Sequence, residues 1–202
     1  MKGLLLKDYY LIKSVLYIIL VVFAIVGIGM SFLASTWVLA VLATVMLGMI
    51  SVTTINMDKN SGWRKVSVVL PVSRKAVLDS KYILYLLLSG TGLLSGIVLS
   101  IAVSVCRGEF DSHSMLLFVS ISIAMALFSG SMTIPFTFLF SEEKSLLGLI
   151  IAYPLSAIVF MGAAMLIDDK LTACGLVAAA GILLYTVSWG VARKYIAGRD
   201  IG

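Results

Sequence analysis

The longest uncharged stretch of this sequence places the strongest limit on its fold. Residues 14–57 contain no Asp, Glu, Lys or Arg, a run of 44 residues. As one straight helix this run would measure about 66 Å, whereas a bilayer core of about 30 Å is crossed by about 20 apolar residues. The run therefore predicts two membrane-spanning helices. We place the turn between them at residues 33–37, where small polar residues meet a tryptophan suited to the membrane interface.

Four further uncharged stretches follow, and each has a length that suits one crossing. Because they are continuously apolar, they do not fit the alternating strands of a membrane barrel. Only 12% of the 202 residues are charged and 61% are hydrophobic, which excludes a soluble domain. The expected fold is all-α, a polytopic membrane protein with one transmembrane domain over residues 1–202. The six transmembrane helices are expected at residues 15–33, 37–56, 83–105, 115–139, 146–167 and 172–192.

The basic residues predict the orientation of these helices. Six crossings place both termini on one side, and thirteen of the 15 Lys and Arg fall on that side. Only Arg107 and Lys170 fall on the other. Under the positive-inside rule the first side is cytoplasmic, so both termini are expected inside. The thirteen are Lys2, Lys7, Lys13, Lys59, Arg64, Lys65, Arg74, Lys75, Lys81, Lys144, Arg193, Lys194 and Arg199.

Residues that carry chemistry are scarce in this chain. No Asp, Glu, Lys, Arg or His lies in the middle of an expected span, which argues against an ion-coupled transporter. His113 is the only histidine, and no glycine-rich phosphate loop or metalloprotease motif occurs. We therefore expect no catalytic residue, no metal site and no cofactor bound by this chain. The composition also gives no indication of nucleic-acid binding.

The second expected span carries four hydroxyl side chains, which have two interpretations. Hydroxyls in membrane helices commonly bond back to their own helix or to a neighbouring one. They could instead give a translocation path a mildly polar lining. The candidate lining residues are Thr44, Ser51, Thr53 and Thr54.

Glycine and proline residues mark other features of the spans. Gly92 and Gly96 form a GxxxG motif that permits close helix approach but does not identify the partner helix. Pro135 and Pro154 each remove a helical hydrogen bond and predict a kink. Nearby Ser or Thr hydroxyls could satisfy the freed carbonyls.

The segment 57–82 is the one loop long enough for specific work. A helix over residues 61–70 would place Trp63, Val66 and Leu70 on one edge, with basic residues beside them. Pro71 cannot continue this helix, and Ser73 is placed to cap the next one, which runs through Lys81 into the third span. Such a short helix fits two functions equally well on physical grounds. It could lie on lipid headgroups, or it could insert into a groove of a cytoplasmic partner.

Several residues of this loop resemble a known family. Asp58-Lys59-Asn60, Trp63 and Leu70-Pro71-Val72-Ser73-Arg74, with Lys81-Tyr82 opening the third span, are similar to the cytoplasmic loop of small ABC-2-type permeases. The opening Met1–Asp8 is also similar to that family's start. These permeases are six-span subunits of bacterial peptide and antimicrobial exporters, including the phenol-soluble modulin exporter group.

The resemblance implies a permease subunit with an ABC-2, type V exporter-like topology in the bacterial cytoplasmic membrane. Its loop would carry a coupling helix that seats in a separate ATPase subunit, which binds ATP and Mg²⁺. A second permease chain, identical or not, would complete the cavity, and residues 1–14 would form an interfacial segment. The residues expected at the ATPase interface are Trp63, Arg64, Val66, Val69, Leu70, Pro71, Ser73 and Arg74, with Glu142 and Glu143 as a smaller second contact.

We expect the substrate to be a hydrophobic or amphipathic peptide, because the spans carry no fixed charge. One alternative of a different class remains. The chain could be a membrane scaffold or regulatory protein whose basic loop binds lipid or a cytoplasmic partner without transport.

Overall fold

The computed structural model describes residues 2–33, 35–63, 73–108, 110–140, 142–167 and 169–197. Within these ranges the chain is helical and contains no strand. The helices are α1 (Lys2–Leu33), α2 (Val38–Asn60), α4 (Arg74–Arg107), α5 (Ser112–Leu139), α6 (Glu142–Leu166) and α7 (Lys170–Ala197). The all-α fold is therefore confirmed, and the turn expected at residues 33–37 separates α1 from α2.

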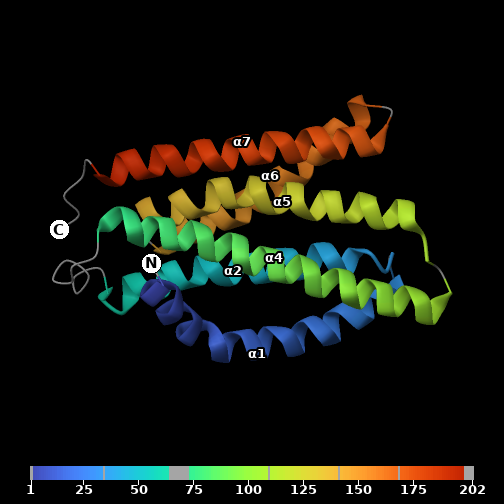
Figure 1. Ribbon diagram of the computed structural model, residues 1–202, viewed down its shortest axis with the longest axis horizontal. Coiled ribbons are helices and arrows are strands. Elements are labelled where there is room, and N and C mark those ends of the chain that lie inside the picture. The colour runs from blue at the N-terminus through green and yellow to red at the C-terminus, as the bar shows by residue number, and fades with distance from the viewer. Residues whose placement is uncertain are drawn as a thin grey trace.

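The helices lie side by side as one elongated bundle (Figure 1). The start of α1, the end of α7 and the α2–α4 and α5–α6 junctions all lie at one end, which we call the loop end. Five helices of the described ranges are long and apolar enough to cross a membrane. The described apolar stretch of α6 is shorter, at Ile150–Ala163.

The α2–α4 pair forms the centre of the bundle, and two glycines bring its backbones together. A Cβ added to Gly92 would lie 2.5 Å from the Ala43 carbonyl oxygen, and one added to Gly96 would lie 2.6 Å from the Ala40 Cα. Side chains are thus excluded from both positions by the backbone of α2. The GxxxG motif pairs α4 with α2, which the sequence alone did not specify.

The core between α4, α5 and α7 combines apolar packing with tyrosine hydroxyls. Tyr85 donates to the Ala126 carbonyl oxygen at 2.8 Å, and Tyr185 donates to the Tyr82 carbonyl oxygen at 2.8 Å. All three tyrosines are buried. The hydroxyls of Tyr85 and Tyr185 therefore each donate to a carbonyl oxygen of a neighbouring helix, which is a common way of joining helices inside a membrane.

The proline in α5 creates a bond to α7. Because Pro135 has no N–H, the Ser131 carbonyl one turn earlier receives no helical hydrogen bond. The Ser188 hydroxyl of α7 donates to this carbonyl oxygen at 2.5 Å. A hydroxyl does satisfy the freed carbonyl, but it comes from a neighbouring helix.

The α4–α5 connection is short, and a cap stands at each of the two helix ends that it joins. Gly108 ends α4 in the left-handed conformation, with φ of 68°. Asp111 caps α5: its carboxylate accepts from the Ser114 hydroxyl at 2.6 Å and from the backbone N–H groups of His113 and Ser114. These bonds hold the pKa of Asp111 below its ordinary value. The cap is therefore present at neutral pH and is lost only as the pH falls through the lowered pKa.

The glycine contacts lead to a stability prediction. Gly96→Ala should lower the free energy of unfolding by about 1–3 kcal/mol, because the new methyl group meets backbone atoms that cannot rotate away. Denaturant unfolding in detergent micelles measures the change. Gly90→Ala is the matched control, because a Cβ at Gly90 on the same helix meets nothing within 4 Å. Equal stability of the two variants would contradict the close α2–α4 approach.

Candidate functional site

Four charged side chains from three helices meet at the loop end of the bundle. Lys7 and Asp8 come from α1, Asp58 from the last turn of α2, and Lys81 from the second turn of α4. We call these four residues the charge cluster. It lies at the end of α2, which precedes segment 64–72 in sequence, and at the start of α4, which follows it.

Lys81 is the centre of the charge cluster. Its ammonium lies 2.8 Å from Asp8 Oδ1 and 2.7 Å from Asp58 Oδ2, and it donates to Thr54 Oγ1 at 3.1 Å. The ammonium therefore makes two hydrogen bonds, to Asp8 and Thr54, and a close ion pair with Asp58. The side chains of Lys81 and Asp8 are only 2% and 1% exposed. α1, α2 and α4 are therefore joined at one buried atom.

Lys7 extends the charge cluster towards the loop. Its Nζ donates to Asp58 Oδ1 at 2.5 Å and lies 4.4 Å from the centre of the Trp63 ring. A cation over a tryptophan face is attracted by the ring quadrupole. Trp63 is the last described residue before segment 64–72, so α1 holds the point at which the chain enters the loop.

The two lysines and two aspartates balance each other in charge. Burying an unpaired ion costs several kcal/mol, and pairing with good hydrogen bonds is what makes burial tolerable. The neutral sum explains how α1 can carry charges into the bundle. Lys7 and Asp8 stand next to each other in sequence, and each finds its counter-ion on α2 or α4.

A second polar contact fixes the other side of α4. Asp79 accepts from the Trp189 indole N–H of α7 at 2.7 Å and lies 3.5 Å from the Arg193 guanidinium. Asp79 and Lys81 are two residues apart on α4 and therefore point about 200° apart around the helix. The first turns of α4 are thus held on both sides.

The α5–α6 turn, expected as a smaller second contact, also reaches α2. Lys59, next to Asp58, donates to the Phe140 carbonyl oxygen at 2.7 Å. Within the turn, Ser145 donates to Thr137 Oγ1 at 3.1 Å. The two regions expected at an ATPase interface are therefore joined at the loop end.

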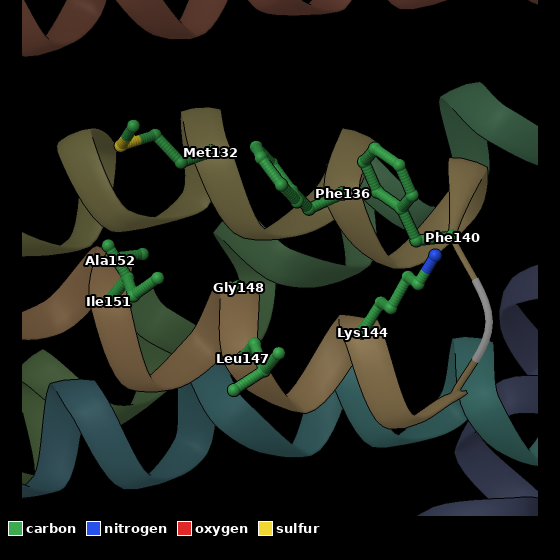
Figure 2. Close-up of a pocket in the computed structure, with 8 residues that line it drawn as sticks. All are labelled: Met132, Phe136, Phe140, Lys144, Leu147, Gly148, Ile151 and Ala152. Carbon is green, nitrogen blue, oxygen red and sulfur yellow. The ribbon is translucent and has the colours of Figure 1, made fainter.

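A groove runs between α5 and α6 from this turn. It is about 310 Å³ in volume, and apart from Lys144 its lining is apolar. Figure 2 shows the Lys144 amine near Phe140 at one end of the groove, and Leu147 and Ile151 further along α6. A groove of this composition suits a lipid-facing surface and holds no group for catalysis. Its lining residues are Met132, Phe136, Phe140, Lys144, Leu147, Gly148, Ile151 and Ala152.

The structure describes part of the predicted interface. Trp63 is half-buried beneath Lys7, and Ser73 caps α4 by accepting from the Ala76 N–H at 3.2 Å, which confirms the predicted cap. Arg74 is exposed at the first position of α4. Arg64, Val66, Val69, Leu70 and Pro71 lie outside the described residues, as do the side chains of Glu142 and Glu143 at the start of α6.

The four hydroxyls proposed as a translocation lining lie in different environments. Thr44, Ser51 and Thr54 are buried within the helix packing, whereas Thr53 is exposed. Thr44 and Thr53 donate to carbonyls four residues earlier, and Thr54 donates to the Ser51 carbonyl. These three therefore bond back to their own helix. Their role as a lining remains a prediction.

Sequence reasoning did not identify the charge cluster. In the sequence, Lys81 indicates orientation, and Asp8, Asp58 and Lys81 belong to segments that resemble a family. Neither property predicts that the three side chains pair with one another. One signal could have found it. Charges of opposite sign border the apolar runs of three helices, all on the side expected to be cytoplasmic. Charges next to apolar runs at the same depth are candidates for pairing.

Among the described residues, no group of three or more His, Cys, Asp or Glu could hold a metal ion. Cys106 is exposed and Cys174 is buried, and both are free thiols. The charge cluster itself is occupied by its own ion pairs. The chemistry that the described residues support is thus electrostatic attachment of helices to one another.

A comparison with family models gives a match over nearly the whole chain. The model described as ABC-2 family transporter protein matches residues 3–196. No curated protein and no solved structure matches the chain.

The charge cluster predicts an asymmetry in stability. Lys81→Met should destabilise the protein by about 3–5 kcal/mol, because it leaves two buried carboxylates with one lysine. Replacing all four members, as Lys7→Met, Asp8→Asn, Asp58→Asn and Lys81→Met together, should restore most of that loss because no buried charge remains unpaired. Denaturant unfolding of both variants in micelles tests this. A four-residue variant less stable than the single one would contradict the pairing.

Proposed function

This chain belongs to the ABC-2 family of transporter proteins, and from this premise we propose that it is the permease subunit of an ATP-binding-cassette exporter. It is a multi-pass membrane protein. In the proposed arrangement α1, α2, α4, α5, α6 and α7 all cross the bacterial cytoplasmic membrane, and the loop end faces the cytoplasm. The charge asymmetry of the sequence supports this orientation.

The anchored loop is the observation that carries the proposal. Trp63 ends the arm before segment 64–72 and lies under Lys7, and Ser73 begins the arm after it and caps α4. Both arms are tied by Lys81 and Asp58 into one buried cluster. A loop with fixed arms can transmit a push from a partner to the helices, whereas a loop on flexible arms would absorb it. The expected partner is a separate cytoplasmic ATPase subunit that binds ATP and Mg²⁺.

The mechanism follows from this attachment. ATP closes two nucleotide-binding subunits, the loops seated in them move, and the helices switch between inward-facing and outward-facing arrangements. A second permease chain completes the translocation path. The permease itself performs no chemistry, so ATP hydrolysis belongs entirely to the partner.

The nature of the described spans supports an amphipathic or hydrophobic substrate, with a peptide as the best candidate. Their described charges gather at helix ends, and several hydroxyls between them donate to backbone carbonyls of their own helix, such as those of Ser129 and Thr137. A path without fixed charges favours an apolar or amphipathic cargo over a small ion. Transport that favours a small charged solute would contradict this assignment.

The loop residues give the test of the proposed partner. Trp63→Ala combined with Leu70→Ala should weaken assembly with the partner ATPase by about 30-fold or more, because buried aromatic and aliphatic anchors at an interface contribute about 2 kcal/mol or more. Co-purification from detergent-solubilised membranes measures assembly. Insertion into the membrane should be normal, because Trp63 and Leu70 lie outside the apolar runs.

The matched control for this experiment is Val105→Ala combined with Leu116→Ala. Both side chains are exposed near the opposite end of the bundle, so assembly should be unchanged. If the loop variant assembles and stimulates ATP hydrolysis like the unaltered chain, the loop has another role. Binding of the unaltered loop to anionic vesicles would then favour the scaffold alternative.

The native cysteine provides a test of orientation. Cys106 is exposed and belongs to the last turn of α4, the end of this helix that lies opposite the loop end (Figure 1). A membrane-impermeant maleimide should therefore label it in intact cells. In a Cys106→Ser background, Ser61→Cys should be labelled only after the membrane is permeabilised. The reverse pattern would place the loop outside the cell and exclude contact with a cytoplasmic ATPase.

A further inference from the structure

Building on the proposed function, we propose that Lys81 and Asp79 are positioning residues that make the start of α4 the lever of this transporter. They attach the returning arm of the loop to α1 and α2 on one side and to α7 on the other. Movement of the start of α4 is thereby delivered to both sides of the bundle at once.

An ion pair joins the two arms of the loop. Asp58 closes the outgoing arm and Lys81 lies about two turns into the returning arm. Their charged atoms are 2.7 Å apart, and Lys7 lies against both Asp58 and the Trp63 ring. The two arms therefore cannot separate without opening a buried ion pair. A force on either arm therefore moves the end of α2 and the start of α4 as one body.

The start of α4 is bonded to α1 on one face and to α7 on the other. Lys81 binds Asp8 of α1 across 73 residues of sequence, and Asp79 binds Trp189 of α7 across 110. Because these two residues point to opposite faces of α4, the helix cannot shift towards one neighbour without pulling on the other. α1 and α7 must follow the first turns of α4.

The charges of this junction need a reason other than stability. Apolar side chains of similar volume would stabilise the same junction as well or better, so stability alone does not explain a buried charge cluster. Ion pairs and hydrogen bonds fix distance and direction, which apolar packing specifies less tightly. A lever needs fixed geometry at its joint more than it needs additional stability.

The experiment uses the full chain assembled with its ATPase in lipid nanodiscs. Spin labels are placed at Tyr17→Cys on α1 and Val191→Cys on α7, both exposed positions, with Cys106→Ser and Cys174→Ala as background. The distance between the labels is measured by pulsed electron paramagnetic resonance, with and without Mg²⁺ and a non-hydrolysable ATP analogue. In the otherwise unaltered complex the nucleotide should shift this distance.

Two variants separate coupling from assembly. The first replaces the charge cluster as Lys7→Met, Asp8→Asn, Asp58→Asn and Lys81→Met, and the second is Asp79→Asn with Trp189→Phe. Each should assemble with the ATPase within about threefold of the unaltered affinity, while the nucleotide-driven shift falls below about half. Lys13→Met, which removes an exposed charge from α1, is the control and should keep the full shift.

Each outcome is decisive. A full shift in both variants overturns the inference while leaving the proposed function intact. Failure of the unaltered chain to bind the ATPase overturns the proposed function and this inference with it. If the four-residue variant does not fold, Lys7→Met with Asp58→Asn replaces it, because this pair leaves the Lys81–Asp8 bond in place. Reduced coupling with normal assembly in that variant supports the lever.

Discussion

The buried ammonium of Lys81 is the interaction on which the loop end of this protein depends. It belongs to α4, donates to Asp8 of α1 and Thr54 of α2 and pairs with Asp58 of α2, so three helices meet at one atom. An ion in this position is tolerated only when every partner is present. The same requirement makes the junction specific. Shifting any one of the three helices would separate a lysine from its carboxylate in a region that water reaches poorly.

The rest of the bundle is arranged so that this junction can act over a distance. Gly92 and Gly96 bring α4 against the backbone of α2, and at these two positions no side chain separates the helices. Tyrosine hydroxyls and the Ser188–Ser131 bond then join α4 and α5 to α7. In the proposed mechanism this framework carries a displacement at one end of α4 to the helices on both sides.

The sequence predicted the helices well because each depends on local properties. Long uncharged runs require crossings, the residues between 33 and 38 favour a turn, and the Ser73 hydroxyl can cap only the helix that follows it. The site was predicted only in part. Trp63 was expected to face a partner, yet the structure places Lys7 over its ring. The hydroxyls of Thr44 and Thr54 could be read as a lining or as bonds within the helix, and sequence spacing did not decide between them.

The sequence by itself therefore determined which segments form long apolar helices, where the first two are separated and how the positive charges are distributed along the chain. These follow from transfer free energies and backbone geometry, and both are read along the chain. Only the tertiary structure decided that Lys7, Asp8, Asp58 and Lys81 belong together, and that Gly92 and Gly96 face α2. Those contacts join residues many turns apart, and their energy depends on which helix faces complement each other in charge and shape.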